Sequence, residues 1–362
     1  MNGLSIGVLC ALLAISQVPA ASNVIPSPTH LAIEAAADTV AQELRDVMTE
    51  DDAAQDEVSG WLHTFEAQPA ASKTKEASAE LTRRIRERFD RVRERYNKYL
   101  QNHPDHARGY LAFGSFLNEI GDEDSAKAQF ENSKQHDPKN PAVWNNLANY
   151  YGEHGQLANA FTHYAQAIKL KPNEPVYYQN LAMMIYLFRN DAREFFHLDE
   201  QQVFDKALGL YQQALQLAPG NFVLATDYAE SYYGIKPLRT QAALAAWTNA
   251  LTIAHTDAER EGVQLHLARV KIAAGLLTEA QTHLDLVTNT AYLDLKKRLT
   301  RSLLEIKNLP TNTVAETATN RPAAMTNTTI AVPHIVATTT NAFDISSNLL
   351  AKPPILQDLK KP

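Results

Sequence analysis

The stretch PAVWNNLANYYGEHGQLANAFTHYAQAIKLKP, residues 141–172, decides the fold. On both sides of Gly155, large apolar residues and alanines recur every three or four positions, which is the spacing of one face of an α-helix. A glycine at this place favours the left-handed backbone that ends a helix, and Pro172 stops the second helix. The stretch therefore predicts two antiparallel amphipathic helices joined by a short turn.

The same pattern recurs along the chain with a period of 34 residues. Pro104, Pro138 and Pro172 are separated by this interval, and so are Gly121 and Gly155. One helix pair cannot bury its apolar face alone, so successive pairs have to stack against one another. The period therefore predicts a chain built from repeated helix pairs.

The residues at the fixed positions of this unit are specific. The stretch resembles the tetratricopeptide repeat at all of its signature positions, which are Trp144, Leu147, Ala148, Tyr151, Gly155, Ala160, Tyr164, Ala167 and Pro172. The resemblance extends over about residues 107–288 and is strongest for the first three units. It implies an all-α fold, an α-solenoid of stacked antiparallel helix pairs that presents a concave groove.

The pattern divides the chain into segments, and the third unit holds an insertion of 13 residues, 189–201. Phe195 and Phe196 in this insertion are expected to fold down as a local hydrophobic contact. The expected segments are a signal peptide (1–21), an acidic helical segment (22–72), a long basic amphipathic helix that is a divergent repeat (73–106), repeats 1 to 5 (107–140, 141–174, 175–221, 222–256 and 257–290), a capping helix (291–307) and a disordered tail rich in Thr, Asn, Pro and Ala (308–362).

Charge is unevenly distributed near the front of the chain. Residues 30–57 carry nine acids and one base, whereas residues 73–98 carry ten bases and five acids. The basic helix could meet an anionic partner, or it could be a solvated face relieved by pairs such as Glu80 with Arg84. In a third interpretation, the acidic segment folds back on the basic helix as an antiparallel hairpin. Charge runs usually mark solvated faces, which favours the last two interpretations.

The first residues predict export. An apolar run is followed by small residues at 18–21, which is typical of a cleaved signal peptide, and the single cysteine, Cys10, would leave with it. The expected location is periplasmic or secreted, with no membrane span after cleavage. Tethering to a membrane by an uncleaved N-terminal segment is the alternative.

Catalytic motifs are missing from the sequence. It has no glycine-rich phosphate loop and no G-x-S-x-G, and the twelve histidines are scattered. The formal net charge of −7 argues against general binding of nucleic acid. We therefore expect no catalytic residues, no metal and no cofactor, and we expect that the protein is not an enzyme.

The resemblance implies which residues face the groove, because the first helix of each unit lines it. An asparagine at the sixth position, as at Asn146 and Asn180, is similar to the family's amide ladder, which hydrogen-bonds an extended peptide backbone. Solvated polar residues without a ligand are the alternative. The expected groove residues are Asn145, Asn146, Asn149, Gln179, Asn180, Met183, Tyr186, Asp227, Glu230 and Tyr233, and the first unit contributes Arg108, Leu111, Ala112, Ser115, Asn118 and Glu119.

The sequence thus predicts a non-enzymatic, exported scaffold that binds a protein or peptide in its concave groove. The alternative is a regulatory or substrate-presenting subunit of a cell-envelope enzyme or of a secretion or assembly machine.

Overall fold

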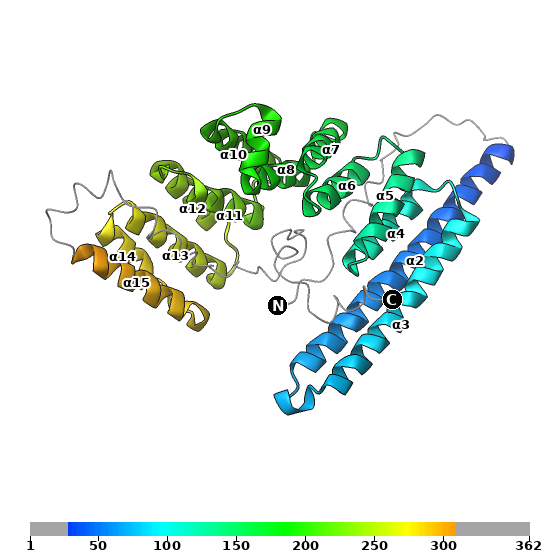
Figure 1. Ribbon diagram of the computed structural model, residues 1–362, viewed down its shortest axis with the longest axis horizontal. Coiled ribbons are helices and arrows are strands. Elements are labelled where there is room, and N and C mark those ends of the chain that lie inside the picture. The colour runs from blue at the N-terminus through cyan, green and yellow to red at the C-terminus, as the bar shows by residue number, and fades with distance from the viewer. Residues whose placement is uncertain (1–27, 309–362) are drawn as a thin grey trace. The chain divides into compact units, whose positions relative to one another are not determined.

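The computed structural model describes residues 28–308, and it describes side chains from residue 39 onward. The described residues are almost entirely helical (Figure 1). They form two compact units, which divide between Pro172 and Asn173. The predicted signal peptide and the predicted disordered tail lie outside the described residues. Within each unit the helices pair as antiparallel neighbours, and the predicted all-α architecture of stacked helix pairs is confirmed.

Unit 1 begins with a long helical hairpin. Helix α2 (Pro28–Glu66) and helix α3 (Lys75–Asn102) run side by side in opposite directions (Figure 1). The guanidinium of Arg88 on α3 contacts the carboxylates of Glu50 and Glu57 on α2. Of the three interpretations of the charge pattern, the structure selects the hairpin.

Two helix pairs follow in unit 1, and their bounds agree with the chemistry of their ends. The side chain of Asp122 accepts from the backbone N–H of Ser125, and Asn140 accepts from that of Ala142, so each asparagine or aspartate caps the helix after it. Pro141 occupies the first turn of its helix, where its missing N–H costs nothing. The four helices are α4 (Ala107–Glu119), α5 (Glu123–His136), α6 (Pro141–Glu153) and α7 (Leu157–Leu170).

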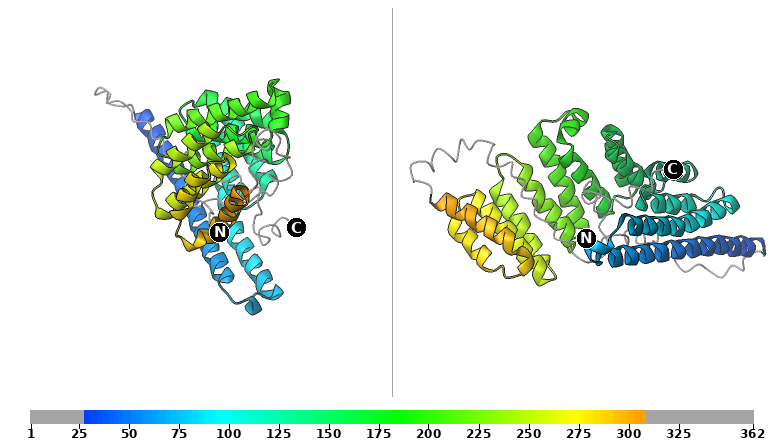
Figure 2. Two further views of the ribbon diagram at one scale, coloured as in Figure 1. Left: turned by 90° about the vertical axis from the view of Figure 1, so that its left-hand side faces the viewer. Right: turned by 60° about the horizontal axis from the view of Figure 1, so that its bottom comes forward.

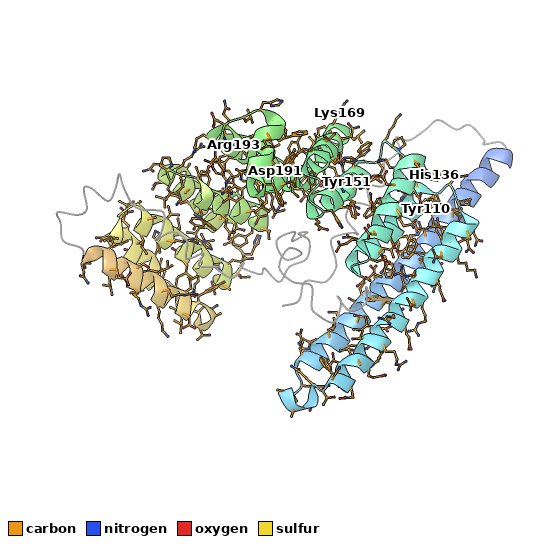
Figure 3. The ribbon with its side chains drawn as sticks, viewed as in Figure 1. Tyr110, His136, Tyr151, Lys169, Asp191 and Arg193 are labelled. Atoms are coloured by element: carbon orange, nitrogen blue, oxygen red, sulfur yellow. The ribbon has the colours of Figure 1, made fainter. Side chains whose placement is uncertain are left out.

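Close packing inside a pair depends on small residues. A Cβ atom on Gly114 of α4 would lie 2.6 Å from the ring of Phe130 on α5, so only glycine allows this approach. On the same two helices, the rings of Tyr110 and His136 stack with centroids 5.5 Å apart (Figure 3). The signature positions of the repeat are therefore contacts across one helix pair.

The turns inside the pairs have the expected left-handed backbone. The φ angles are 85° at Gly121 and 70° at Gly155, and Gly275 in the fifth unit has 77°. The prediction for the first two glycines is confirmed, and the third shows that the fifth pair uses the same turn.

We expect Gly155→Ala to lower the free energy of unfolding by about 1 kcal/mol, because an L-residue in the left-handed region costs roughly 1–2 kcal/mol. No described atom lies within 4 Å of the added Cβ at Gly155, so the cost is conformational. Gly60, inside α2, is equally open, and Gly60→Ala should raise stability by about 0.5–1 kcal/mol. Urea unfolding of both variants measures these changes, and equal shifts would contradict the prediction.

Unit 2 begins with the repeat that carries the insertion. The inserted residues form helix α9 (Arg189–Phe196) and a left-handed residue, His197, and Asp199 then caps the next long helix. Phe196 is half-buried with the ammonium of Lys206 4.5 Å from its ring centre, whereas Phe195 is exposed. The expected inward packing therefore holds for one of the two phenylalanines. The flanking helices are α8 (Pro175–Leu187) and α10 (Glu200–Leu217).

The remaining helices of unit 2 comprise two pairs and a terminal helix. The terminal helix, α15, lies against the last pair (Figure 2). Its residues Leu295, Leu299 and Leu303 are buried. This arrangement covers an apolar face that the last pair would otherwise expose. The bounds are α11 (Phe222–Glu230) with a short 3₁₀ turn (Ser231–Gly234), α12 (Thr240–Ile253), α13 (Asp257–Ala273), α14 (Leu277–Asp285) and α15 (Leu293–Lys307).

Candidate functional site

A depression on unit 1 lies between the first helices of two successive pairs. Ser115 and Asn118 come from α4, Asn146 and Asn149 come from α6, and Phe130 of α5 forms its apolar part. The structure thus brings together two predicted groove residues of the second repeat, Asn146 and Asn149, and two of the first repeat, Ser115 and Asn118. Spacing along α4 and α6 explains this, since residues three or four apart share one helix face.

The amides around this depression differ in their hydrogen bonding. Asn149 is buried and fixed, because the hydroxyl of Tyr164 donates to its Oδ1 at 2.7 Å. The half-buried side chains of Asn118 and Asn146 make no hydrogen bond to any other described residue. An amide carries two donors and an acceptor, so these two side chains can bind a ligand without breaking an internal contact.

Burial of the tyrosine below the depression keeps it neutral. Tyr164 is fully buried, and this burial raises the pKa of its hydroxyl well above the usual range. The hydroxyl therefore stays protonated at physiological pH and can donate its hydrogen bond to Asn149. Asn145, four residues before Asn149 on α6, is buried as well, so Asn146 is the accessible one of the three predicted amides on this helix.

On unit 2, the predicted residues of α8 and α11 are linked to each other. The amide of Gln179 donates to the carboxylate of Asp227 at 2.8 Å, which ties the two helices together. Asn180 is only 2% exposed, in contrast to the half-buried Asn146. The two asparagines at the sixth position therefore do not present equal amides to solvent.

The other predicted residues of unit 2 include two tyrosines with defined packing. Tyr186 lies with its ring centre 6.1 Å from that of Phe204, and its hydroxyl lies where a side chain at Gly234 would be. Met183 on α8 and Glu230 on α11 are half-buried. These contacts give Tyr186 a packing role in addition to its place on the predicted face.

Tyr233 belongs to a cluster that joins the last two pairs. Its hydroxyl lies 3.0 Å from Nδ1 of His266, and the His266 ring stacks on Trp247 with centroids 4.0 Å apart. The guanidinium of Arg269 lies 4.1 Å from the centre of the Tyr233 ring, a cation–π contact. Burial raises the pKa of Tyr233 well above its usual range, so its hydroxyl stays protonated.

Arg269, which contacts the predicted groove residue Tyr233, was not among the residues that the sequence predicted. The predicted groove residues extend only as far as the fourth unit, and the fifth unit lacks its first aromatic residue. Leu267 and Ala268 nevertheless hold the register of that unit, and this register places Arg269 at its ninth position. The register was therefore the signal that could have found it.

Between residues 39 and 308, no three His, Cys, Asp or Glu side chains come together in a way that could hold a metal ion. No described helix is both long enough and apolar enough to cross a lipid bilayer.

Comparison with known proteins identifies the repeat. Residues 141–174 match the family model described as tetratricopeptide repeat. The chain is similar to the photosystem I assembly protein Ycf3 of Synechococcus elongatus, at 29% identity over 87 residues, 24% of this chain and 50% of that protein. The Ycf3 of Cyanophora paradoxa is 28% identical over 87 residues, again 24% and 50% of the two chains. The chain thus spans about half the length of the curated relatives it matches.

Two solved structures are similar to this chain over 98% of their own length. YrrB, described as a TPR protein with an unusual peptide-binding site, is 13% identical over 59% of this chain and 98% of its own, with a TM-score of 0.44. Pseudomonas aeruginosa pilF is 15% identical over 72% of this chain and 98% of its own, also with a TM-score of 0.44. The segment matched by the family is helices α6 and α7, and helix pairs of this kind recur before and after it in the sequence. Residues 141–174 are therefore a tetratricopeptide repeat, set in a series of further helix pairs.

Proposed function

We propose that this chain is a non-enzymatic scaffold and that the depression on unit 1 binds an extended segment of a partner protein. The observation that carries the proposal is the pair of accessible amides, Asn118 and Asn146, which have no hydrogen bond within the described part of the chain. They project from the first helices of successive repeats, beside the hydroxyl of Ser115. This family generally binds proteins or peptides through such surfaces.

The chemistry of the depression favours recognition of the main chain. A peptide backbone alternates N–H donors and C=O acceptors, and a side-chain amide can satisfy both. The residues that line the depression carry no formal charge, and Phe130 adds apolar surface. Such a site supplies affinity with little selectivity for the partner's sequence, and specificity has to come from residues outside it.

The proposal includes an exported location, which the pattern of residues 1–21 supports. A regulatory or substrate-presenting subunit of a larger envelope assembly remains the alternative. It would use the same surface, but its occupant would be a permanent partner subunit.

The test uses 12-residue peptides selected from an unbiased display library on the full chain, with their affinities measured by calorimetry. A hydrogen bond contributes about 0.5–1.5 kcal/mol, so losing two should weaken binding roughly tenfold in Asn118→Ala/Asn146→Ala. The matched control is Asn159→Ala on α7, an exposed asparagine whose amide contacts only Gln156. Its affinity should stay within about twofold.

Two outcomes would refute the proposal. One is that the selected peptides bind the double variant as tightly as the native chain. The other is that the double variant and the control lose affinity equally. Thermal unfolding of each variant shows whether any loss of affinity comes from a loss of folded protein.

A further inference from the structure

Asp51 is a buried acid in the middle of the hairpin. It lies on the face of α2 that packs on α3 and is 8% exposed. The hydroxyl of Tyr96 on α3 donates to its Oδ2 at 2.9 Å, and the amide of Gln55 donates to its Oδ1 at 3.4 Å. These two neutral donors are the hydrogen-bond partners of a carboxyl group that has little access to water.

A second acid shares one of these donors. Glu119, at the end of α4, accepts from the same Nε2 of Gln55 at 3.3 Å. A single amide therefore lies between carboxyl groups of two helices and joins the hairpin to the first repeat. Asp52, next to Asp51, adds a third carboxylate whose charge acts on both. We refer to Asp51, Asp52 and Glu119 as the carboxyl cluster.

The basic side chains near the carboxyl cluster are engaged elsewhere. From α3, Arg88 binds Glu50 and Glu57 of α2, and Arg95 lies 3.9 Å from Glu50. The groups that face the cluster from the three packed helices are Asp56 and Gln55 of α2, Tyr96 and Arg88 of α3, and Glu119 of α4 itself. Among the described residues, no member of the cluster has an ion-pair partner.

We propose that the carboxyl cluster is a proton-operated clasp, which holds the hairpin α2–α3 against α4 when it is protonated and loosens that junction when it is ionised. When ionised, Asp51 and Glu119 repel each other across the amide of Gln55, and the charge of Asp52 adds to this repulsion. The burial of Asp51 keeps water from screening its charge. Protonation removes the repulsion and gives each carboxyl group an O–H donor that the ionised cluster lacks.

The titration of the buried acids has the direction that this clasp requires. Burial raises the pKa of Asp51 to about 7, and burial together with the charges of Asp51 and Asp52 raises that of Glu119 to about 8. In an unfolded chain both groups would titrate near pH 4. The folded junction therefore takes up protons as the pH falls through 8 and 7, and its stability rises over that range, whereas ionisation at higher pH lowers it.

The experiment is hydrogen exchange of the full chain between pH 6.0 and 8.5, with rates corrected for the pH dependence of the exchange chemistry. The opening constant of segments around 51–58 and 113–120 should rise at least ~10-fold from pH 6.0 to 8.5, because one pKa unit corresponds to a factor of ten. Helices α13 and α14 in unit 2 are the internal reference and should change far less.

Variants separate the clasp from a general effect of pH. Asp51→Asn/Glu119→Gln, which imitates the protonated cluster, should remove the pH dependence and keep the junction protected at pH 8.5. The control, Asp46→Asn, changes an exposed acid of α2 that contacts only Gln42, and it should retain the pH dependence. An unchanged pH slope in the double variant, or an opening constant that falls as the pH rises, would overturn the proposal.

A direct titration covers the case in which the double variant does not fold. Carbon-13 NMR of the native chain should show two side-chain carboxyl groups that titrate between pH 6 and 9. If every carboxyl group titrates below pH 5.5, the clasp does not exist. This test does not involve the depression on unit 1, so its result is independent of the peptide-binding proposal.

Discussion

Trp247→Ala is expected to lower the free energy of unfolding of unit 2 by about 4 kcal/mol, within the range measured for removing a buried tryptophan. Trp247 is fully buried on α12, and its indole stacks on His266 and lies 6.1 Å from Tyr233, ring centre to ring centre. Alanine would leave a cavity between α11, α12 and α13, because His266 is held by the Tyr233 hydroxyl and cannot fill it. Urea unfolding followed by far-ultraviolet circular dichroism measures the loss.

Trp144→Ala is the comparison that shows whether burial is the cause. Trp144 is half-buried on α6 of unit 1, and its indole N–H donates to the carbonyl of Pro138. Its replacement removes one hydrogen bond and part of an apolar contact, which should cost only about 1–2 kcal/mol. If Trp247→Ala costs no more than Trp144→Ala, the packing described for unit 2 is wrong.

The repeat itself could be predicted because its determinants are local. Gly155 ends a helix through its own backbone, and Pro172 stops the next one wherever the pair packs. Small residues occupy signature positions where the two helices of a pair approach most closely, as Gly114 does against the ring of Phe130. A periodic sequence therefore predicts both the helices and the partner of each, since the partner is the next helix along the chain.

The hairpin could be predicted only as one of three arrangements. Charge alone does not decide whether a basic helix meets solvent, a ligand or another part of the chain, because all three reduce its self-repulsion. The local pairing expected between Glu80 and Arg84 is replaced by one between Glu80 and Arg83, and Arg84 instead lies over the ring of Trp61. Such choices depend on tertiary neighbours that no short-range pattern specifies.

The candidate site, too, could be predicted only in part from the sequence. The resemblance to the repeat family implied that Asn146 and Asn149 line a groove together with residues of the preceding repeat, and the depression contains both. The sequence could not show that Tyr164 fixes Asn149, or that Asn180 is buried whereas Asn146 is accessible. The register of a repeat predicts direction, but burial and hydrogen bonding depend on the neighbouring helices.

Arg88→Ala is expected to destabilise unit 1 by about 3 kcal/mol, at the low end of the range for breaking a buried ion pair. The guanidinium is 5% exposed and contacts Glu50 at 2.8 Å and Glu57 at 3.0 Å, so one side chain joins two carboxylates of α2 to α3. The low end applies because Glu57 is 49% exposed and Glu50 33%, and water can rehydrate both once Arg88 is removed. The same hydrogen bonds lower the pKa of Glu57.

Arg83→Ala, five residues earlier on α3, is the matched control. Arg83 also contacts two carboxylates, those of Glu80 and Glu87, but all three side chains are more than half exposed. Exposed ion pairs contribute little to stability and are screened by salt, so this variant should change the unfolding midpoint little, and still less at 1 M NaCl. Arg88→Met keeps the apolar stem, so the loss that persists in it measures the ionic contact. If Arg88→Ala and Arg83→Ala unfold at the same urea concentration, the hairpin is not held by the buried arginine.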